Sequence, residues 1–123
     1  MSTNYKKATT DALVQMFRAV ASGRGAALEK ANPKTANRLY RQMVKLYAEI
    51  KRRGSQAQRQ ILPLLDDEDA SVRASAATYA LEFDARAAEP VLEKIDREER
   101  NLCGLTAQMV LKQWKAGKLR FPP

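Results

Sequence analysis

The stretch Leu64–Phe83, LLDDEDASVRASAATYALEF, reads as the end of one helix, a tight acidic turn and a second helix. Asp69 stands where an N-cap is expected, because a short carboxylate can accept the free N–H groups of a first helical turn. The residues that follow repeat at the spacing of one helix face, and alanines keep that helix slim. The repeating apolar residues are Val72, Ala76, Ala80 and Phe83. The stretch predicts a helical hairpin whose second helix admits a close neighbour.

The same pattern returns thirty residues further along the chain. Seven positions in 61–81 share their apolar, acidic or small character with positions in 91–111. The pairs are Ile61 and Val91, Leu62 and Leu92, Leu65 and Ile95, Asp66 and Asp96, Val72 and Leu102, Ala77 and Ala107, and Leu81 and Leu111. A period of 20–50 residues built from two helices is typical of a helical solenoid.

The segment Asp67–Leu81, DEDASVRASAATYAL, resembles a HEAT-type repeat of the short, phycobilisome-lyase-like kind. Repeats of that kind place an acidic turn and a Val-Arg pair before an alanine-rich helix. The second copy departs from this pattern, because Cys103 replaces the arginine and Arg100–Asn101 replace the acidic cap. We therefore expect one typical repeat and one degenerate repeat.

The predicted fold class is all-α, a short HEAT-like α-solenoid of about six helices in antiparallel pairs. Thr9 or Thr10 can cap a first helix over 11–22, which we expect Ser22–Gly25 (SGRG) to break, with a further turn over 26–31. Asn32-Pro33 opens a long second helix that stops at Gly54, since a capping side chain precedes a proline at the first helical position. The other helices are expected over 56–65, where Pro63 should kink the helix or shorten its last turn, and over 70–82, 85–97 and 102–116.

We expect a single domain over 1–123. Its parts are a flexible N-terminus (1–9), an N-terminal helical layer (10–54), a HEAT-like repeat (55–83), a degenerate second repeat (84–117) and a tail (118–123). Trp114 is expected to cover the end of the helical stack.

Composition argues against several classes of function. With no histidine and one cysteine, Cys103, the chain lacks the ligands of Cys/His zinc sites and the residues of Ser-His-Asp and Cys-His catalysis. Gly23 and Gly25 belong to no nucleotide fingerprint. We therefore predict no enzyme, no catalytic residue, no metal and no cofactor. The lack of a long apolar run or a secretory signal, together with the lone cysteine, predicts a cytoplasmic protein without a membrane partner.

The charge is concentrated in the first half of the chain. Residues 1–60 carry 13 Lys/Arg against 3 Asp/Glu, and residues 61–123 carry 9 against 11, so the two halves have net charges of +10 and −2. On the predicted second helix, five cations fall on the side opposite the apolar face, in a row roughly 25 Å long. These are Lys34, Arg38, Arg41, Lys45 and Arg52. The row is either a solvated outer face or a contact ridge for phosphates or an acidic protein.

Few acids interrupt this row, which favours a contact ridge, because a face that serves stability usually alternates its signs. Glu49 can pair with Lys45 or Arg53 at its edge. The candidate partner-binding residues are Lys34, Arg38, Arg41, Lys45, Arg52, Arg53 and Arg73. Arg73 is also placed to form a surface ion pair with the turn carboxylates. Tyr40 and Tyr47, one heptad apart, are interpreted as packing at the edge of the core.

Over residues 10–121 the order of features resembles a bacterial family. The features are the helix Leu13–Val20, the pair Asn37-Arg38, a helix ending Arg52-Arg53-Gly54, the run Ile61–Leu65 and the terminal Trp114–Gly117. The chain is similar to a HEAT-like family catalogued as a domain of unknown function, number two-zero-one-nine. This resemblance implies a small, cytosolic, all-helical protein without known catalytic residues. Small helical-repeat proteins of this sort are often encoded beside bacterial toxins, where they act as immunity proteins.

Three hypotheses for the function follow. The first is a protein-binding module, most concretely an immunity-type inhibitor that docks on a toxin or another protein with an acidic surface. The second is a nucleic-acid-binding HEAT-like protein that uses cations of the second helix on phosphates, namely Lys34, Arg38, Arg41, Lys45, Arg52 and Arg53. The third, suggested only by the repeat type, is an enzyme subunit or a phycobilin-lyase-like partner.

Overall fold

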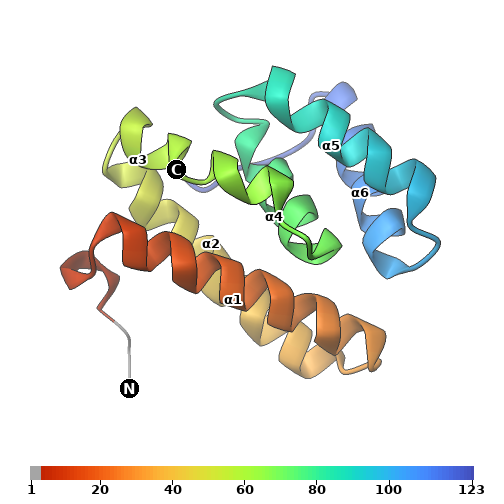
Figure 1. Cartoon of the computed structure of the whole chain (residues 1–123), viewed down its shortest axis with the longest axis horizontal. Helices are drawn as coiled ribbons and strands as arrows, with labels where there is room; N and C mark the ends of the chain where they lie inside the picture. The colour runs from red at the N-terminus through yellow and green to blue at the C-terminus, as the bar shows by residue number, and fades with distance from the viewer. Residues whose placement is uncertain (1–3) are drawn as a thin grey trace.

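The computed structural model describes residues 4–123, and this part of the chain is helical, with no strand. Figure 1 shows α1 and α2 side by side, α5 and α6 together on the other side, and α4 between them. The elements are η1 (Tyr5–Lys7), α1 (Thr10–Glu29), α2 (Pro33–Arg52), α3 (Ser55–Arg59), η2 (Leu62–Asp66), α4 (Ala70–Ala80), α5 (Ala85–Glu98) and α6 (Leu102–Lys115), where η denotes a 3-10 helix. The all-α class predicted from the sequence is confirmed.

The central helix α4 is almost entirely buried. Val72, Ala76 and Ala80 are fully inaccessible to solvent, as the apolar spacing predicted. Because these side chains are small, α1, α5 and α6 all pack directly against α4. Its Tyr79 stacks on Tyr47 of α2, with 4.4 Å between ring centroids, and meets the edge of Phe17 of α1 at 5.7 Å. Burial of such large side chains contributes roughly 1.5–3 kcal/mol each.

Capping side chains fix where several helices begin. Asn32 accepts a hydrogen bond from the backbone N–H of Thr35 at 3.2 Å, and Asp69 accepts one from Ser71 at 2.9 Å. Asp84 and Thr9 cap α5 and α1 in the same way. These four caps agree with the starts predicted from the sequence, because a cap depends only on residues within one turn.

The predicted break at Ser22–Gly25 is wrong, since α1 continues to Glu29. Gly25 lies where α1 crosses the start of α4, and a Cβ atom on it would overlap the side chain of Ser71. The glycine therefore permits a close helix crossing and does not end the helix. The helix ends later, where Ala31 adopts a positive φ of 53°.

The predicted helix over 56–65 is also corrected. The chain forms α3 and then the separate 3-10 helix η2, because Pro63 lacks the N–H group that a continuous α-helix requires. Ser55 is the first residue of α3, and Gly54, with φ of 103°, occupies the cap position. The segments that begin at Ile61 and Val91 thus differ in local structure. Leu102 is also 46% exposed, although its counterpart Val72 is buried.

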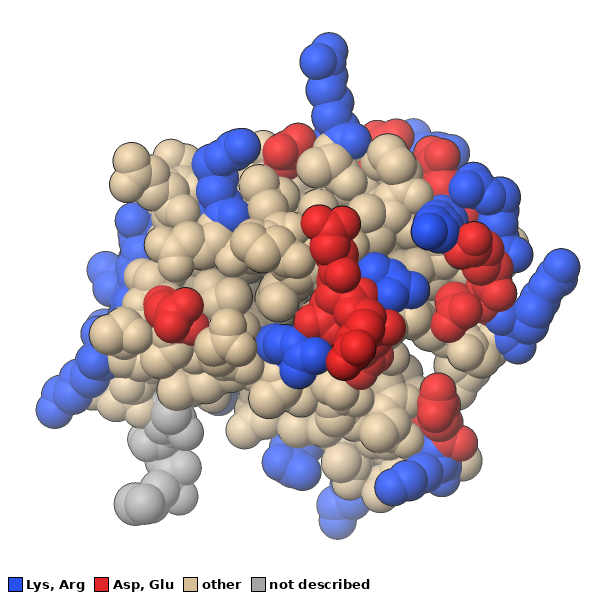
Figure 2. Space-filling view, in the orientation of Figure 1, with Lys and Arg blue, Asp and Glu red and all other residues tan. Residues whose placement is uncertain are grey.

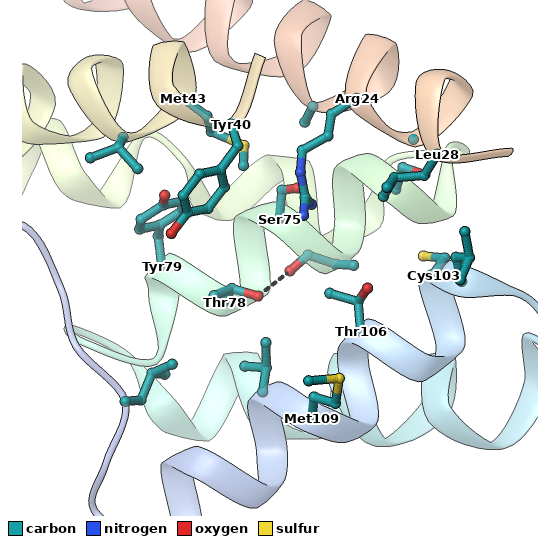
Figure 3. A pocket seen from close by; sticks show the side chains of 18 of the residues that line it. Arg24, Leu28, Tyr40, Met43, Ser75, Thr78, Tyr79, Cys103, Thr106 and Met109 are labelled. Carbon is teal, nitrogen blue, oxygen red and sulfur yellow. Dashed lines mark hydrogen bonds between the residues drawn. The ribbon is translucent and has the colours of Figure 1, made fainter. Parts of the chain in front are cut away.

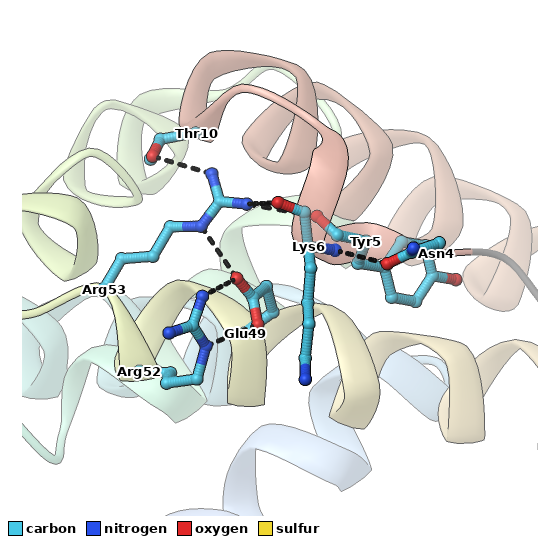
Figure 4. Close-up of polar contacts among 7 residues, drawn as sticks. All are labelled: Asn4, Tyr5, Lys6, Thr10, Glu49, Arg52 and Arg53. Atoms are coloured by element: carbon cyan, nitrogen blue, oxygen red, sulfur yellow. Dashed lines mark hydrogen bonds and ion pairs between the residues drawn. The ribbon is translucent and has the colours of Figure 1, made fainter.

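Of the segment 1–9 that the sequence predicted to be flexible, residues 1–3 lie outside the described part, and Tyr5–Lys7 forms η1. Arg53 holds η1 against the end of α2 by donating hydrogen bonds to the backbone carbonyls of Tyr5 and Lys6 and to the Thr10 hydroxyl (Figure 4). Across residues 4–123, no helix combines the length and the apolar content needed to cross a bilayer.

Candidate functional site: an apolar groove

A pocket of about 560 Å³ lies between α1, α2, α4 and α6, with residues 119–122 at one end. Its floor is the side of α4 that carries Ser75, Thr78 and Tyr79, which face the pocket (Figure 3). The Thr78 hydroxyl is engaged, donating to the backbone carbonyl of Ala74 at 2.7 Å. Burial raises the pKa of Tyr79, so its phenol is neutral at physiological pH. The floor offers small side chains and hydroxyl groups, but no charge.

The α6 wall carries an exposed apolar row. Leu102, Leu105 and Met109 are 46%, 51% and 56% exposed, and their spacing of three and four places them along one side of the helix. Leu102 and Met109 line the pocket, and Leu105 extends the row beyond it. Tyr40, 47% exposed, stands on the opposite wall. Single exposed apolar residues are ordinary, but a continuous group beside a pocket marks a candidate contact surface.

Arg24 brings positive charge into the groove. It extends from α1 toward Ser75 (Figure 3), and its guanidinium carbon lies 5.3 Å from the centre of the Tyr40 ring. Its Nε atom is buried, and no acceptor within the described residues receives its hydrogen. Glu29 and Arg120 also border the pocket.

The C-terminal segment closes one end of the groove. Lys51 donates a hydrogen bond to the carbonyl of Pro122 at 2.7 Å, and the Phe121 ring packs edge-on against Trp114 at 6.5 Å. Trp114 also donates to Glu89 of α5 at 2.8 Å. These contacts tie the tail across the molecule, with Trp114 holding it against α6.

The seven cations predicted to bind a partner fall into three sets, which lie along α2, at the end of α2 and in the first turn of α4. Lys34, Arg38, Arg41 and Lys45 are exposed on α2 and form no ion pair with any described residue. We call these four residues the cationic row. Figure 2 shows basic side chains projecting at the edge of the molecule where α1 and α2 lie, and acidic ones gathered near the start of α4 and along α5.

Arg52 and Arg53 instead clamp Glu49, with nitrogen–oxygen distances of 2.7 and 2.9 Å (Figure 4). These hydrogen bonds, the one from Arg52 being the stronger influence, lower the pKa of Glu49 to about 2. Glu49 thus pairs with both arginines, and Lys45 forms no ion pair with the residues that the structure describes. The Arg53 side chain is only 17% exposed and joins the end of α2 to η1, whereas the Arg52 side chain is 60% exposed.

Arg73 donates to the backbone carbonyls of Asp67 and Glu68, at 2.7 and 3.2 Å. The expected pairing with the turn carboxylates is therefore wrong. The Asp67 carboxylate is taken by Arg18 of α1 at 2.6 Å, and this hydrogen bond lowers the pKa of Asp67. Arg73 braces the turn before α4.

The groove also contains one thiol. Its thiol, Cys103, has a pKa raised by burial and is therefore protonated near neutral pH. Among residues 4–123, no group of three or more Cys, Asp or Glu side chains is arranged to hold a metal ion. This groove was not predicted from the sequence. One signal was present in α6, where Leu102, Leu105 and Met109 follow one another at spacings of three and four.

The fold and the groove define an all-α protein with a concave apolar surface. The chain belongs to the family described as a domain of unknown function (DUF2019), whose family model matches residues 11–114. It is similar over 97% of its length to the crystal structure of the protein RPA1889 from Rhodopseudomonas palustris CGA009. That similarity has a TM-score of 0.88 at 25% sequence identity and covers 98% of the other chain. No curated protein sequence matches significantly.

Proposed function

We propose that this protein is a non-catalytic protein-binding module whose groove receives an apolar helical segment of a partner protein. The observation that carries the proposal is the continuity between the pocket and the exposed row Leu102, Leu105 and Met109 on α6. An amphipathic helix that lies along such a row buries its own apolar face in the adjoining pocket.

The shape of the apolar surface favours a protein segment over a small molecule. The pocket volume of about 560 Å³ is within the usual range for small ligands. However, a molecule contained in the pocket would leave Leu105 in water, because that residue lies beyond the lining. A helix laid along α6 would cover the pocket and the row together.

A short HEAT-like solenoid provides the architecture for this function. We propose that α1 with α2, α3 and η2 with α4, and α5 with α6 form successive antiparallel pairs, with the groove on their concave side. Such a scaffold is rigid, so a partner docks without a large ordering cost. With a net charge of +8, the protein favours an acidic partner. The family resemblance suggests a concrete form, an immunity-type inhibitor of a bacterial toxin, which we place in the cytoplasm.

A photo-crosslinking experiment tests the groove against the cationic row. A photoreactive phenylalanine derivative replaces Leu105 in one variant and Arg38 in a matched variant. We expect position 105 to crosslink one saturable partner, and the purified partner to bind Met109→Asp at least tenfold more weakly than the wild-type chain. Crosslinking from position 38 alone, or unchanged affinity in Met109→Asp, would contradict docking in the groove.

A second candidate, nucleic-acid binding, is favoured by the cationic row itself. Its four residues carry no ion pair within the described chain and extend over roughly 17 Å of α2. If each contacts one phosphate, the slope of log affinity against log salt is about −3 to −4. Fluorescence anisotropy with duplex and single-stranded oligonucleotides between about 50 and 200 mM salt measures this slope. No binding at the lowest salt concentration would eliminate this candidate.

A further inference from the structure

Resting on the proposed function, we infer that the partner segment carries a carboxylate among its apolar side chains, and that Arg24 receives it inside the groove. This assigns Arg24 as the residue that selects an acidic side chain, and it specifies the chemistry of the partner: an amphipathic helix with one Asp or Glu on its apolar face.

Arg24 differs from the other partly buried arginines in its hydrogen bonding. Arg18 and Arg53 bind carboxylates, and Arg73 binds backbone carbonyls. Arg24 is also partly buried, yet its buried Nε has no acceptor among the described residues. A buried donor without an acceptor is unfavourable, because it has lost water and gained nothing in return. Because the buried Nε is closed to solvent, a ligand recovers that loss when the Arg24 side chain turns to meet an acceptor in the groove.

The surroundings of Arg24 favour a carboxylate as this acceptor. The Tyr40 ring, 5.3 Å from the guanidinium carbon, supports the guanidinium through a cation–π contact and limits its motion. A planar guanidinium presents parallel N–H groups that match the two oxygens of a carboxylate. Arg24 points toward Ser75, which is 8% exposed (Figure 3). The Ser75 hydroxyl forms no hydrogen bond with the described part of the chain.

The charge balance of the groove argues for a single negative charge. Glu29 lines the same pocket and would repel a phosphate dianion more strongly than a carboxylate. The other lining residues near Arg24 are mainly apolar or neutral, such as Leu28, Met43 and Thr106. The lining carries two cations, Arg24 and Arg120, against Glu29, and a single carboxylate on a short side chain surrounded by apolar neighbours matches this net charge of +1.

A displayed library of amphipathic 16-residue helices tests the inference on the full chain. Each helix has apolar residues at i, i+3 and i+7, and one central position varies among Glu, Gln, Lys and Leu. The baits are the wild-type chain, Arg24→Gln, Arg38→Gln and Met109→Asp. Arg38→Gln is the matched control, since it removes the same charge from the cationic row and leaves the groove intact.

We expect the wild-type chain and Arg38→Gln to enrich Glu at the variable position, and Arg24→Gln to lose that preference. In calorimetry, the Glu form of a selected peptide should bind the wild-type chain about tenfold more tightly than its Gln form. Arg24→Lys keeps the charge but lacks the guanidinium fork, so it should recover only part of the preference. A merely structural Arg24 would change the melting temperature and leave the Glu-to-Gln ratio unchanged.

The outcomes separate this inference from the function on which it rests. If no selected peptide depends on Met109, docking in the groove fails, and the inference fails with it. If peptides depend on Met109 but show no preference for Glu, or keep it in both Arg24→Gln and Arg24→Lys, the inference alone is overturned.

Discussion

Gly23 and Gly25 lie two residues apart in α1, and each faces another helix, but Gly25 is much more tightly enclosed. A Cβ on Gly25 would overlap the Ser71 side chain, whereas one on Gly23 would meet Leu39 Cδ1 at 3.3 Å. We expect Gly25→Ala to lower the free energy of unfolding by about 1–3 kcal/mol through overpacking. Gly23→Ala should stay within about 1 kcal/mol of the wild-type chain, because Leu39 can move and alanine favours the helix. Urea denaturation measures both.

Removing the obstructing side chain provides the control for this pair. In the double variant Gly25→Ala with Ser71→Gly, the overlap disappears, and part of the lost stability should return. Equal stability of Gly25→Ala and Gly23→Ala would contradict the role assigned to the α1–α4 crossing.

Glu49 predicts a specific acid dependence of stability. Its pKa in the folded chain is about 2, below the ordinary value of 4.5, because Arg52 and Arg53 bind the carboxylate. Its contribution is therefore complete above pH 4.5 and is lost as the pH falls toward 2. We expect Glu49→Gln to cost about 1–2 kcal/mol at neutral pH. Urea denaturation at neutral and acidic pH should show the gap between wild-type and variant closing as the pH falls.

The exposed Glu29 provides a comparison for this experiment. Glu29→Gln also removes one carboxylate, but it breaks no ion pair in the described part of the chain, so its stability should follow that of the wild-type protein. A Glu49→Gln deficit that stays constant down to acidic pH would show that the ion pairs with Arg52 and Arg53 are not its cause.

At the scale of elements, the stability of α4 depends on its N-cap residue, Asp69. The Asp69 carboxylate accepts hydrogen bonds from the Ser71 backbone N–H at 2.9 Å and from the Ser22 hydroxyl of α1 at 2.7 Å. Asp69→Ala removes the cap and the link to α1, and we expect a loss of about 1–2 kcal/mol. Asp66→Ala, at an exposed position of the same turn, should change stability by less than about 0.5 kcal/mol. Equal melting temperatures of the two variants would contradict the capping role of Asp69.

The helices that sequence analysis predicted well are those with local signals. Asn32, Asp69 and Asp84 cap their own first turns, and the apolar spacing in 70–82 depends only on that helix. The continuation of α1 through Gly25 could not be predicted, because it depends on contact with Ser71, which is distant in the sequence. Pro63 explains why residues 56–65 divide into α3 and η2. From the sequence alone, however, a proline predicts a kinked helix as readily as a broken one.

The same distinction applies to the candidate site. The exposure of Lys34, Arg38, Arg41 and Lys45 follows from helical periodicity and was predicted. The groove could not be predicted, since Arg24, Tyr40 and Ser75 come from three different helices. The sequence indicated only in part that Glu49 pairs with Arg52 and Arg53, because Lys45 lies at an equally suitable spacing from Glu49.

At the scale of the whole molecule, the cationic row is expected to lower the stability of the fold. Its residues follow one another at spacings of four, three and four, so neighbouring positive charges repel by about 0.2–0.5 kcal/mol per pair. Glutamine has a similar helix propensity to lysine and arginine. We therefore expect the quadruple variant Lys34→Gln, Arg38→Gln, Arg41→Gln and Lys45→Gln to be about 0.5–1 kcal/mol more stable at low salt.

Added salt and a second variant provide the controls for this prediction. The gain should shrink as added salt screens the repulsion, whereas Arg52→Gln with Arg53→Gln should lower stability, because those arginines bind Glu49. Stabilisation on removal of the row would mean that folding does not require it, as is common where a surface serves binding. If the quadruple variant instead loses more than about 1 kcal/mol in urea denaturation, the row serves stability, and nucleic-acid binding loses the observation that favours it.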